Sequence, residues 1–514
     1  MSDPIADYIV SDSKPRVVLL EAGSDPSSNP AVSGFLSGLS LLGGEFDYGF
    51  KTEPIPSTAG RVHTLNTAKA LGGGSVLNHG GWLRADAAAY DDWADVVGDR
   101  RWGYEGLKPW LCKTEHFHDP DATPDEHGFD GPMHVVSVSA SESGGRKYPL
   151  RQPVKDAWLE LGVTSGLAEM PENTRDGGRQ PSNIVYPLDK VKVYTNTLVH
   201  RVYVSDGTAT GVELADGRRI DAQKEVILCA GAFRTPQVLM LSGIGPSALL
   251  QKQGIPVIHN SPYVGQNLHD HFALFLAYRL RDPSLGYALG RSSWQDQCLF
   301  KCLPWDWVVS QPLPTDIISK HEADARKQKR DLWEVITIYA PPGIPGIPID
   351  GTHIATSTML LRPTSRGTVS IRSNDPTDAP LIQPNHFSSG LDRDTLVHAA
   401  QMTLKAIMST KSMESIVEGE SPPAGEGLDG LTPLSADSSL EAVEERIRQT
   451  GLAHAHPGGT AAMGQVVDTE GKVLGVKGLR VADASIIPIP LSGHPQATLY
   501  AMAEQLTSLI LGDS

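Results

Sequence analysis

Short apolar runs that end at polar or glycine residues mark the first strands of the chain. Residues 16–20 read Arg-Val-Val-Leu-Leu and are followed by Glu21, Ala22 and Gly23. A continuous β-branched and apolar run of this length is typical of a buried strand in a parallel sheet. The pattern predicts a strand that ends at an acidic residue, the position from which dinucleotide-binding folds bond ribose hydroxyls.

Further apolar runs predict more strands in the middle of the chain. Residues 198–204, 211–214 and 219–222 have strand-like patterns. Asp216-Gly217 separates the last two, which predicts a hairpin turn between them. Residues 225–229 predict another buried strand, in which Cys229 is interpreted as a small buried hydrophobic residue.

Helical patterns follow two of these strands and indicate a discontinuous fold. Thr235–Leu241 predicts an apolar helix after the strand at 225–229, and Ala497–Leu511 predicts a closing helix. Between them, Leu479–Ala482 predicts a strand that ends at Asp483. Because 514 residues exceed the usual size of one core, we expect an α/β protein of two or three domains. The predicted nucleotide-binding domain comprises 1–90, 190–265 and 450–514, and the predicted substrate-binding domain comprises 91–189 and 266–449.

Two unusual segments lie in the predicted substrate-binding domain. Residues 294–307 contain three tryptophans, and residues 341–348 read Pro-Pro-Gly-Ile-Pro-Gly-Ile-Pro. The second predicts an irregular loop. Either segment is compatible with the lining of a substrate cavity, or with plain core packing and a surface loop.

Composition narrows the choice of partners. The formal net charge of −16 argues against nucleic acid and against an anionic membrane surface. The N-terminal residues show no signal-peptide pattern and no segment has eighteen uninterrupted apolar residues, so we expect a cytoplasmic protein. The 4 cysteines are too few for a disulfide framework, and their spacing predicts no metal site.

Two histidines are the strongest candidates for chemistry. His456 lies in Ala-His-Pro-Gly-Gly-Thr and His494 in Ser-Gly-His-Pro-Gln-Ala. Proline fixes its own backbone and restricts the residue before it, so both rings are expected on rigid loops. A lone histidine in such a loop is most often an ordinary turn residue. Two of them together are a pair that can exchange protons near neutral pH.

A glycine-rich segment is the second motif that bears on function. Residues 71–81 read Leu-Gly-Gly-Gly-Ser-Val-Leu-Asn-His-Gly-Gly, which permits close approach of backbone to a ligand. Residues 231–245 and the segment Asn-Leu-His-Asp-His at 267–271 follow in order. Together with the two histidine segments, this set resembles the glucose-methanol-choline (GMC) family of flavin oxidoreductases along nearly the whole chain.

The resemblance implies a fold and a set of site residues. The implied fold is an FAD-binding domain of Rossmann type assembled from discontinuous pieces, plus a substrate domain with an antiparallel sheet. His456 and His494 match the catalytic pair of the family. The implied cofactor-binding residues are Glu21, Gly73, Gly74, Asn78, His79, Gly80, Gly81, Val199, Asp483, Ala484 and Pro495. Leu77 stands where some relatives have a histidine linked to FAD, so the cofactor is expected to be non-covalent.

The implied reaction is FAD-dependent oxidation of the CH–OH group of a small or medium organic alcohol. One ring takes the hydroxyl proton while hydride passes to flavin N5, and the other ring holds the oxygen. The electron acceptor is O2 or another, unknown, compound. A role in secondary metabolism is expected by analogy alone.

The N-terminus departs from the family. Asp7–Val10 resembles the first strand, yet only residues 11–15 separate it from the strand at 16–20. A parallel crossover needs at least about ten residues, so about twenty residues, including the Gly-x-Gly-x-x-Gly phosphate loop, are missing.

Three explanations remain open at this stage. The chain is a truncated isoform or the product of a faulty gene model, or its shortened loop still holds FAD. Alternatively, it has abandoned flavin for redox-neutral acid/base work as an isomerase, dehydratase or cyclase. An inactive relative that serves as a binding protein is the non-enzymatic alternative.

Overall fold

The computed structural model describes residues 16–36, 38–119, 121–139, 146–290, 294, 296–321 and 330–512. The first strand expected at Asp7–Val10 lies outside these residues. The helices are α1 (Gly74–Leu77), α2 (Ala87–Val97), α3 (Tyr104–Thr114), α4 (Arg151–Glu160), α5 (Ser182–Val185), α6 (Gly231–Leu241), α7 (Ser247–Lys252), α8 (Thr315–Ile318), α9 (Gly390–Met408), α10 (Leu440–Thr450) and α11 (Pro495–Leu511).

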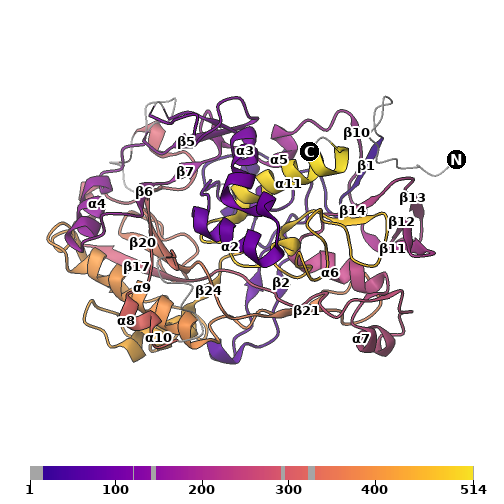
Figure 1. Ribbon diagram of the computed structural model, residues 1–514. Helices are drawn as coiled ribbons and strands as arrows, with labels where there is room; N and C mark the ends of the chain where they lie inside the picture. The colour runs from indigo at the N-terminus through magenta and orange to yellow at the C-terminus, as the bar shows by residue number, and fades with distance from the viewer. Residues whose placement is uncertain are drawn as a thin grey trace.

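The nucleotide-fold strands form parallel pairs and a meander, on the right of Figure 1. The parallel pairs are β1 (Val17–Leu20) with β10 (Val191–Tyr194), and β14 (Val226–Leu228) with β25 (Leu479–Val481). The antiparallel meander is β11 (Val199–Ser205), β12 (Thr208–Leu214) and β13 (Arg219–Asp221). The strands predicted from the apolar runs are therefore confirmed, although β1 is half-buried rather than fully buried.

Helix α6 begins at Gly231, before the predicted start at Thr235. The backbone N–H of Gly231 donates to the carboxylate of Asp483 at 3.0 Å, and the Thr235 hydroxyl donates to the same oxygen at 2.5 Å. This carboxylate comes from a strand end that is distant in sequence. It stabilises the first turn, so the local pattern could not show where the helix starts.

A seven-stranded antiparallel sheet forms the other side of the molecule. Its order is β23 (Val417–Ser421), β17 (Phe272–Leu280), β20 (His353–Leu360), β19 (Trp333–Ile338), β18 (Trp305–Gln311) and β6 (Leu167–Glu169), with β24 (Leu452–Ala453) paired to β17. Every residue of β19 and β20 is buried, and α9 packs against both strands. Figure 1 shows α9 and α10 beside this sheet on the left of the molecule. The antiparallel sheet expected from the family resemblance is therefore present.

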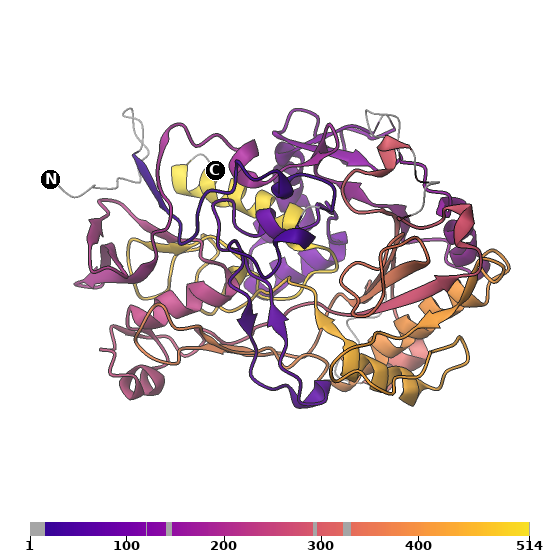
Figure 2. The same cartoon turned by 180° about the vertical axis from the view of Figure 1, so that it is seen from behind.

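The remaining strands are short. They are β2 (Phe50–Lys51), β3 (Thr64–Leu65), β4 (Glu115–Phe117), β5 (Met133–Ser137), β7 (Pro171–Glu172), β8 (Thr174–Arg175), β9 (Gly178–Arg179), β15 (Ile244–Gly245), β16 (His259–Asn260), β21 (Thr368–Ser370) and β22 (Leu381–Gln383). Figure 2 shows the β2–β3 hairpin, in indigo, near the middle of the molecule from behind. It lies between the two sides.

Two large hydrophobic cores underlie the two sides. One lies between Val138 and Ile447 and contains Trp294, Trp305 and Trp307, so core packing accounts for the tryptophan-rich segment. Residues 341–348 form an irregular loop, as predicted. The other core joins α2 and α3 to β14, β25 and α11. Residues 91–135, which the predicted boundaries place in the substrate domain, thus pack largely with the nucleotide-fold strands. The domain boundaries stay a prediction.

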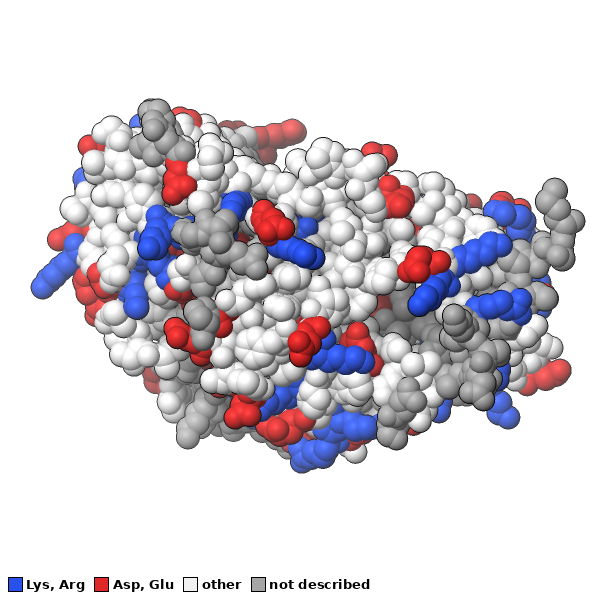
Figure 3. Space-filling model, turned by 90° about the horizontal axis from the view of Figure 1, so that it is seen from above, with Lys and Arg blue, Asp and Glu red and all other residues white. Residues whose placement is uncertain are grey.

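The surface carries no large patch of one charge in the view of Figure 3, where Lys and Arg lie among Asp and Glu. Among the described residues, no helix is long and apolar enough to span a bilayer.

Candidate active site

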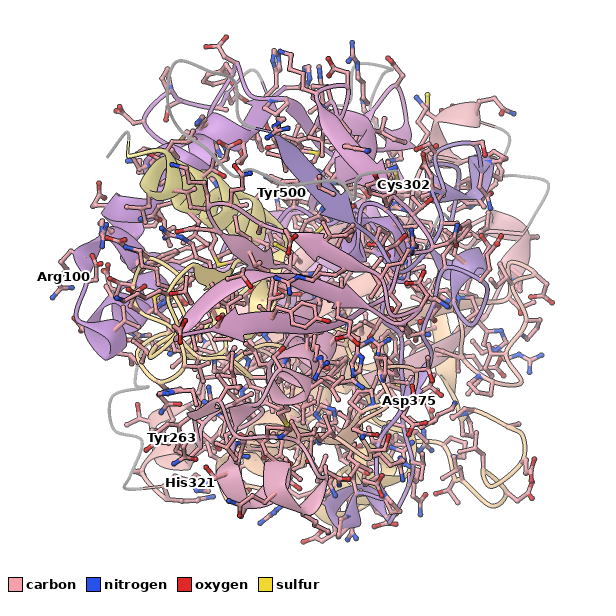
Figure 4. The ribbon with its side chains drawn as sticks, turned by 90° about the vertical axis from the view of Figure 1, so that its right-hand side faces the viewer. Arg100, Tyr263, Cys302, His321, Asp375 and Tyr500 are labelled. Carbon is pink, nitrogen blue, oxygen red and sulfur yellow. The ribbon has the colours of Figure 1, made fainter. Side chains whose placement is uncertain are left out.

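His494 lies directly before α11 and forms the N-cap residue of that helix. Two aromatic contacts hold the helix in place. The Tyr500 ring lies 5.3 Å from Trp82 and 5.8 Å from Tyr186, measured between centroids. The Thr498 hydroxyl also lies 2.7 Å from the Tyr90 hydroxyl. Figure 4 shows Tyr500 on α11 in the upper part of that view. The predicted loop position of His494 is thus the start of a helix that packs against the protein along one face.

His456 lies on a loop that is bonded to the segment before β17. His269 and Gly458 exchange backbone hydrogen bonds of 3.1 and 2.9 Å. The backbone N–H of His456 donates to Asp270 Oδ1 at 2.7 Å. Burial raises the pKa of Asp270 to about 8, which keeps this carboxyl protonated near neutral pH. The loop around His456 is therefore fixed by buried groups.

The backbone of this loop is strained at one residue. Ala455 has a φ of 59°, in the left-handed region where a Cβ atom costs roughly 1–2 kcal/mol. Its conformation places the rings of His454 and His456 5.0 Å apart. Strain of this kind often accompanies a functional arrangement of side chains.

The structure brings the two predicted catalytic rings together and adds two more. The centroids of His456 and His494 are 4.9 Å apart. His271 lies 5.0 Å from His456, and His454 lies 5.7 Å from His494. Sequence patterns predicted no role for His271 or His454. His271 belongs to the Asn-Leu-His-Asp-His segment, which was the only available signal.

The hydrogen bonds assign the proton of His456. His271 Nε2 lies 3.0 Å from the carbonyl of Leu491, which can only accept, so this nitrogen donates. Burial lowers the pKa of His271 to about 3, so its ring is neutral and its Nδ1 is an acceptor. His456 Nδ1 is 2.9 Å from that acceptor and therefore carries a hydrogen.

His456 consequently presents a free base. Burial holds the pKa of His456 well below its usual value of 6.5, so the ring is neutral. With the hydrogen on Nδ1, Nε2 carries the lone pair. In the part of the chain that the structure describes, no hydrogen bond occupies Nε2. This nitrogen can accept a proton from a ligand beside His494.

Glu334 is a further residue that the sequence did not indicate. Its Oε1 lies 2.8 Å from His494 Nε2, and its side chain is 2% exposed. It occupies the second position of the buried strand β19, far in sequence from both histidines.

The predicted ribose-binding residues adjoin the glycine-rich segment. Glu21 follows β1, and its carboxylate accepts the N–H of Gly23 at 2.6 Å. Burial raises the pKa of Glu21. The N–H of Leu71 donates to the carbonyl of Ser24 at 3.0 Å, which joins this loop to residues 71–81. Val199 begins β11, and Thr197 just before it donates its N–H to the carbonyl of Glu21 at 2.8 Å.

The far end of the glycine-rich segment reaches the predicted catalytic pair. A Cβ on Gly81 would lie 3.8 Å from His494 Nδ1 and 3.5 Å from Met170 Sδ. His79 is close enough to contribute to the lowered pKa of both His454 and His456. Asn78 is occupied within the protein, because its Oδ1 accepts from the N–H of Gly80 at 3.2 Å and from Arg179 at 3.0 Å.

Asp483 and Ala484 connect the strand β25 to the His456 loop. Besides Gly231 and Thr235, the Asp483 carboxylate accepts the N–H of Ser485 at 2.8 Å. The carbonyl of Ala484 accepts the N–H of Gly459 at 3.3 Å. Pro495 is the first residue of α11. The predicted residues therefore lie along one path from Glu21 to the two histidines.

Several residues near this predicted site border open space. A Cβ on Gly73, Gly74 or Gly231 would meet no atom within 4 Å. Cys229 is exposed, although Val226 and Leu228 of the same strand are 8% and 6% exposed. The prediction of a buried Cys229 is therefore wrong, because the strand ends at this open space. Strand ends beside a helix N-terminus and open glycines fit a dinucleotide cofactor. No cluster of described residues could hold a metal ion.

The family models and relatives agree with this arrangement. Residues 52–273 and 363–503 match the N- and C-terminal models of the GMC oxidoreductases. The chain is 34% identical to the GMC-type oxidoreductase acuG of Aspergillus aculeatus, over 96% of this chain and 94% of that protein. It is 30% identical to an oxygen-dependent choline dehydrogenase of Citrobacter koseri, over 99% and 93%.

The solved structures include a close fold match. A formate oxidase of Aspergillus oryzae, studied for its FAD modification, superimposes with a TM-score of 0.86 and is 25% identical, over 97% of this chain and 94% of that one. The expected fold is confirmed by this match.

Proposed function

This chain belongs to the GMC oxidoreductase family, and we propose that it oxidises the CH–OH group of a small organic alcohol with a non-covalently bound FAD. The observation that carries the proposal is the free Nε2 of His456, held as a neutral base beside His494. An alcohol carbon releases hydride readily only when its oxygen loses a proton, so such a base is required.

The cofactor would lie along the path from Glu21 to the catalytic pair. Glu21 and Val199 would hold the adenosine, and Gly73 and Gly74 would allow the backbone to approach the cofactor closely. The Asp483–Ala484 turn would line the middle of the path, and Gly80 and Gly81 would lie nearest the reacting ring. Leu77 offers no group for a covalent link, which favours non-covalent binding. When bound, the flavin would supply the acceptor for the hydride.

The protein residues would manage the proton and the substrate oxygen. The hydroxyl proton would pass to His456 Nε2, and His494, whose Nδ1 lies near Gly81, would bind the oxygen. His271 keeps the hydrogen of His456 on Nδ1, so that Nε2 stays an acceptor. Asp270 holds the loop backbone that carries His456.

The direct test is the visible absorbance of the protein purified with added FAD, followed by anaerobic addition of a panel of primary and secondary alcohols. We expect a bound flavin that is bleached by at least one alcohol. His456→Ala should bind the same amount of flavin but bleach about 10²- to 10⁴-fold more slowly.

Folded protein without bound flavin would overturn the proposal. This outcome is informative, because the sequence analysis predicts that the glycine phosphate loop is missing. Turnover by a colourless protein without any electron acceptor would indicate the redox-neutral acid/base alternative.

A further inference from the structure

The seven-stranded sheet has one face under α9 and a second face that is not covered by this helix. Side chains alternate between the two faces along a strand. In β17, Leu274 and Leu276 belong to the large core that also contains Leu404 of α9, so both lie on the helix side. Phe275, which stands between them, therefore points to the opposite face.

Phe275 connects this second face to the histidines. Its ring stacks on His454, with the centroids 5.9 Å apart and an interplanar angle of 6°. The residue paired with Phe275 on β20 is Ser357, whose hydroxyl lies 3.3 Å from His454 Nε2. His454 in turn lies 5.0 Å from His456 and 5.7 Å from His494. Phe275 is only half-buried, so part of its ring stays accessible.

The loop at 341–348 adds two isoleucines to this surface. Ile344 and Ile347 pack in one cluster with Phe275 and Ala355 of the sheet. Ile344 is 7% exposed, whereas Ile347 is half-buried, as Phe275 is. Phe275, Ile344 and Ile347 together are called the apolar wall below. The loop is therefore more than a surface connection, because it packs against the ring that stacks on His454.

The backbone of this loop is held in one conformation. Gly343 and Gly346 take φ values of 70° and 75°, which other residues rarely adopt. Ala424 donates its N–H to the carbonyl of Pro345 at 2.9 Å, and a Cβ on Gly346 would lie 2.8 Å from the Ala424 carbonyl oxygen. A surface that is already ordered binds a ligand without the entropic cost of fixing a loop.

The segments that build the apolar wall are uncharged. They are 272–278 and 341–349, and neither contains Asp, Glu, Lys or Arg. Burial holds the pKa of His454 well below its usual value of 6.5, so the ring that covers Phe275 is neutral. Glu334, on the neighbouring strand β19, is hydrogen-bonded to His494 at 2.8 Å. A charged or polyhydroxylated group beside this wall would lose its hydration without a matching partner.

We propose that the apolar wall lines the substrate site and selects alcohols with an uncharged apolar body over sugar-like alcohols and quaternary ammonium alcohols. This specificity rests on the proposed function. The hydroxyl group would lie at His456 and His494, and the body of the alcohol would extend along the wall. Phe275 and Ile347 keep accessible surface and would contact that body, whereas the more deeply buried Ile344 would support them.

A series of alcohols tests the selectivity. We expect kcat/KM, measured by flavin bleaching, to rise from ethanol to 1-hexanol by about fourfold for each CH2 group that the wall covers. Choline has a body of similar size but carries a charge, so it should react about 5- to 150-fold more slowly than 1-hexanol. Oxidation of choline or glycerol at the rate of 1-hexanol, or no rise along the series, would overturn the proposal.

Ile347→Ala and Ile349→Ala form a matched pair within one segment. Ile347 belongs to the wall, whereas Ile349 is 43% exposed and lies in none of the hydrophobic clusters of the described residues. Ile347→Ala should lower kcat/KM for 1-hexanol about 5- to 50-fold, mainly through KM, with a smaller loss for ethanol. Ile349→Ala should change neither value.

Phe275→Ala, with folding checked by Tm, should discriminate between the two alcohols as Ile347→Ala does. Phe275→Leu keeps an apolar side chain and should retain most of the preference for 1-hexanol. Unchanged kcat/KM in Ile347→Ala and Phe275→Ala would contradict the role of the wall. Equal losses in Ile347→Ala and Ile349→Ala would contradict it as well.

Binding of 2-phenyl-2-propanol separates this inference from the proposed oxidation. This tertiary alcohol has an apolar body but no hydrogen on its carbinol carbon, so it cannot be oxidised to a carbonyl compound. With the protein as purified, we expect saturation-transfer NMR to detect its ring protons, and Kd to rise at least about threefold in Ile347→Ala but not in Ile349→Ala.

The two failures then look different. If 2-phenyl-2-propanol binds with this pattern but no alcohol of the series is oxidised, the proposed function fails and the apolar wall stands. If alcohols are oxidised but Kd is the same in the unaltered protein, Ile347→Ala and Phe275→Ala, the apolar wall is overturned and the proposed function stands.

Discussion

Replacement of His271 tests whether a residue that never touches the substrate sets the catalytic base. His271 accepts from His456 Nδ1 at 2.9 Å and donates to the carbonyl of Leu491 at 3.0 Å. His271→Leu removes both functions. His271→Gln keeps both, because one amide carries an acceptor and a donor. The two variants therefore differ in the hydrogen-bond relay rather than in size alone.

The expected loss of activity follows from these two hydrogen bonds of His271. In His271→Leu the Nδ1–H of His456 is left buried without an acceptor, which costs about 1–3 kcal/mol. The hydrogen can then move to Nε2, where it blocks the base. If the whole cost raises the free energy of the transition state, kcat/KM falls by about 5- to 150-fold. We expect His271→Gln to stay within about fivefold of the unaltered protein, since its net hydrogen bonds are of similar strength.

The assay is kcat/KM for an alcohol identified by flavin bleaching, together with Tm for each variant. His386→Leu is a suitable control, because His386 is another buried histidine with a pKa of about 3 that stacks on Phe272. It should lower Tm without changing kcat/KM. Equal activity in His271→Leu, His271→Gln and the unaltered protein would refute the assignment of the His456 base.

Three further results are expected. Asp483→Ala leaves the N–H groups of Gly231 and Ser485 without their acceptor, at a cost of about 1–3 kcal/mol for each buried group. Tm should therefore fall by several degrees in Asp483→Ala, whereas Asp483→Asn should keep most of the stability. An unchanged Tm in Asp483→Ala would contradict this. Gly81→Val should abolish bleaching by alcohol with little loss of Tm, because the new side chain starts 3.8 Å from His494 Nδ1; normal turnover would place the substrate elsewhere. Stability in urea should decrease from about pH 6 to pH 4, by about 1.4 kcal/mol per pH unit for each net proton. Burial lowers the folded-state pKa values to about 3 for His269, His271 and His386 and to about 4 for His63, so the unfolded chain takes up these protons first and stability is lost as pH falls below 6.5. Three carboxyl groups act in the opposite sense, because burial raises the pKa to about 8 for Asp270 and to about 6 for Asp306 and Asp331. They are fewer than the four histidines. A rise in the urea midpoint on acidification would show that the carboxyl groups dominate.

The strands of the nucleotide-fold side were predictable because each is a local apolar run between turn residues. The hairpin of β12 and β13 illustrates this, since Gly217 takes a φ of 85° at the predicted turn. The start of α6 was not predictable, because the carboxylate that stabilises it belongs to Asp483. The exposure of Cys229 was missed for a related reason. An apolar run shows that a strand is buried, but not where the strand opens onto a ligand region.

The proposed catalytic pair could be picked out from the sequence because each histidine has a distinctive local setting, a following proline in both cases. The residues that bond to these two histidines, Glu334 and His271, could not be predicted. Glu334 lies in a run of apolar residues whose pattern fits an ordinary sheet strand, and only the pairing of β19 with β18 and β20 carries it to His494. His271 and His456 are joined by the bridge between His269 and Gly458, which links segments far apart in sequence. The sequence around each histidine therefore marks the two candidate residues, whereas the hydrogen bonds of their rings depend on tertiary contacts. A relative that kept both histidines but lost His271 would be expected to keep the fold and lose rate, a distinction that the histidine motifs alone cannot make.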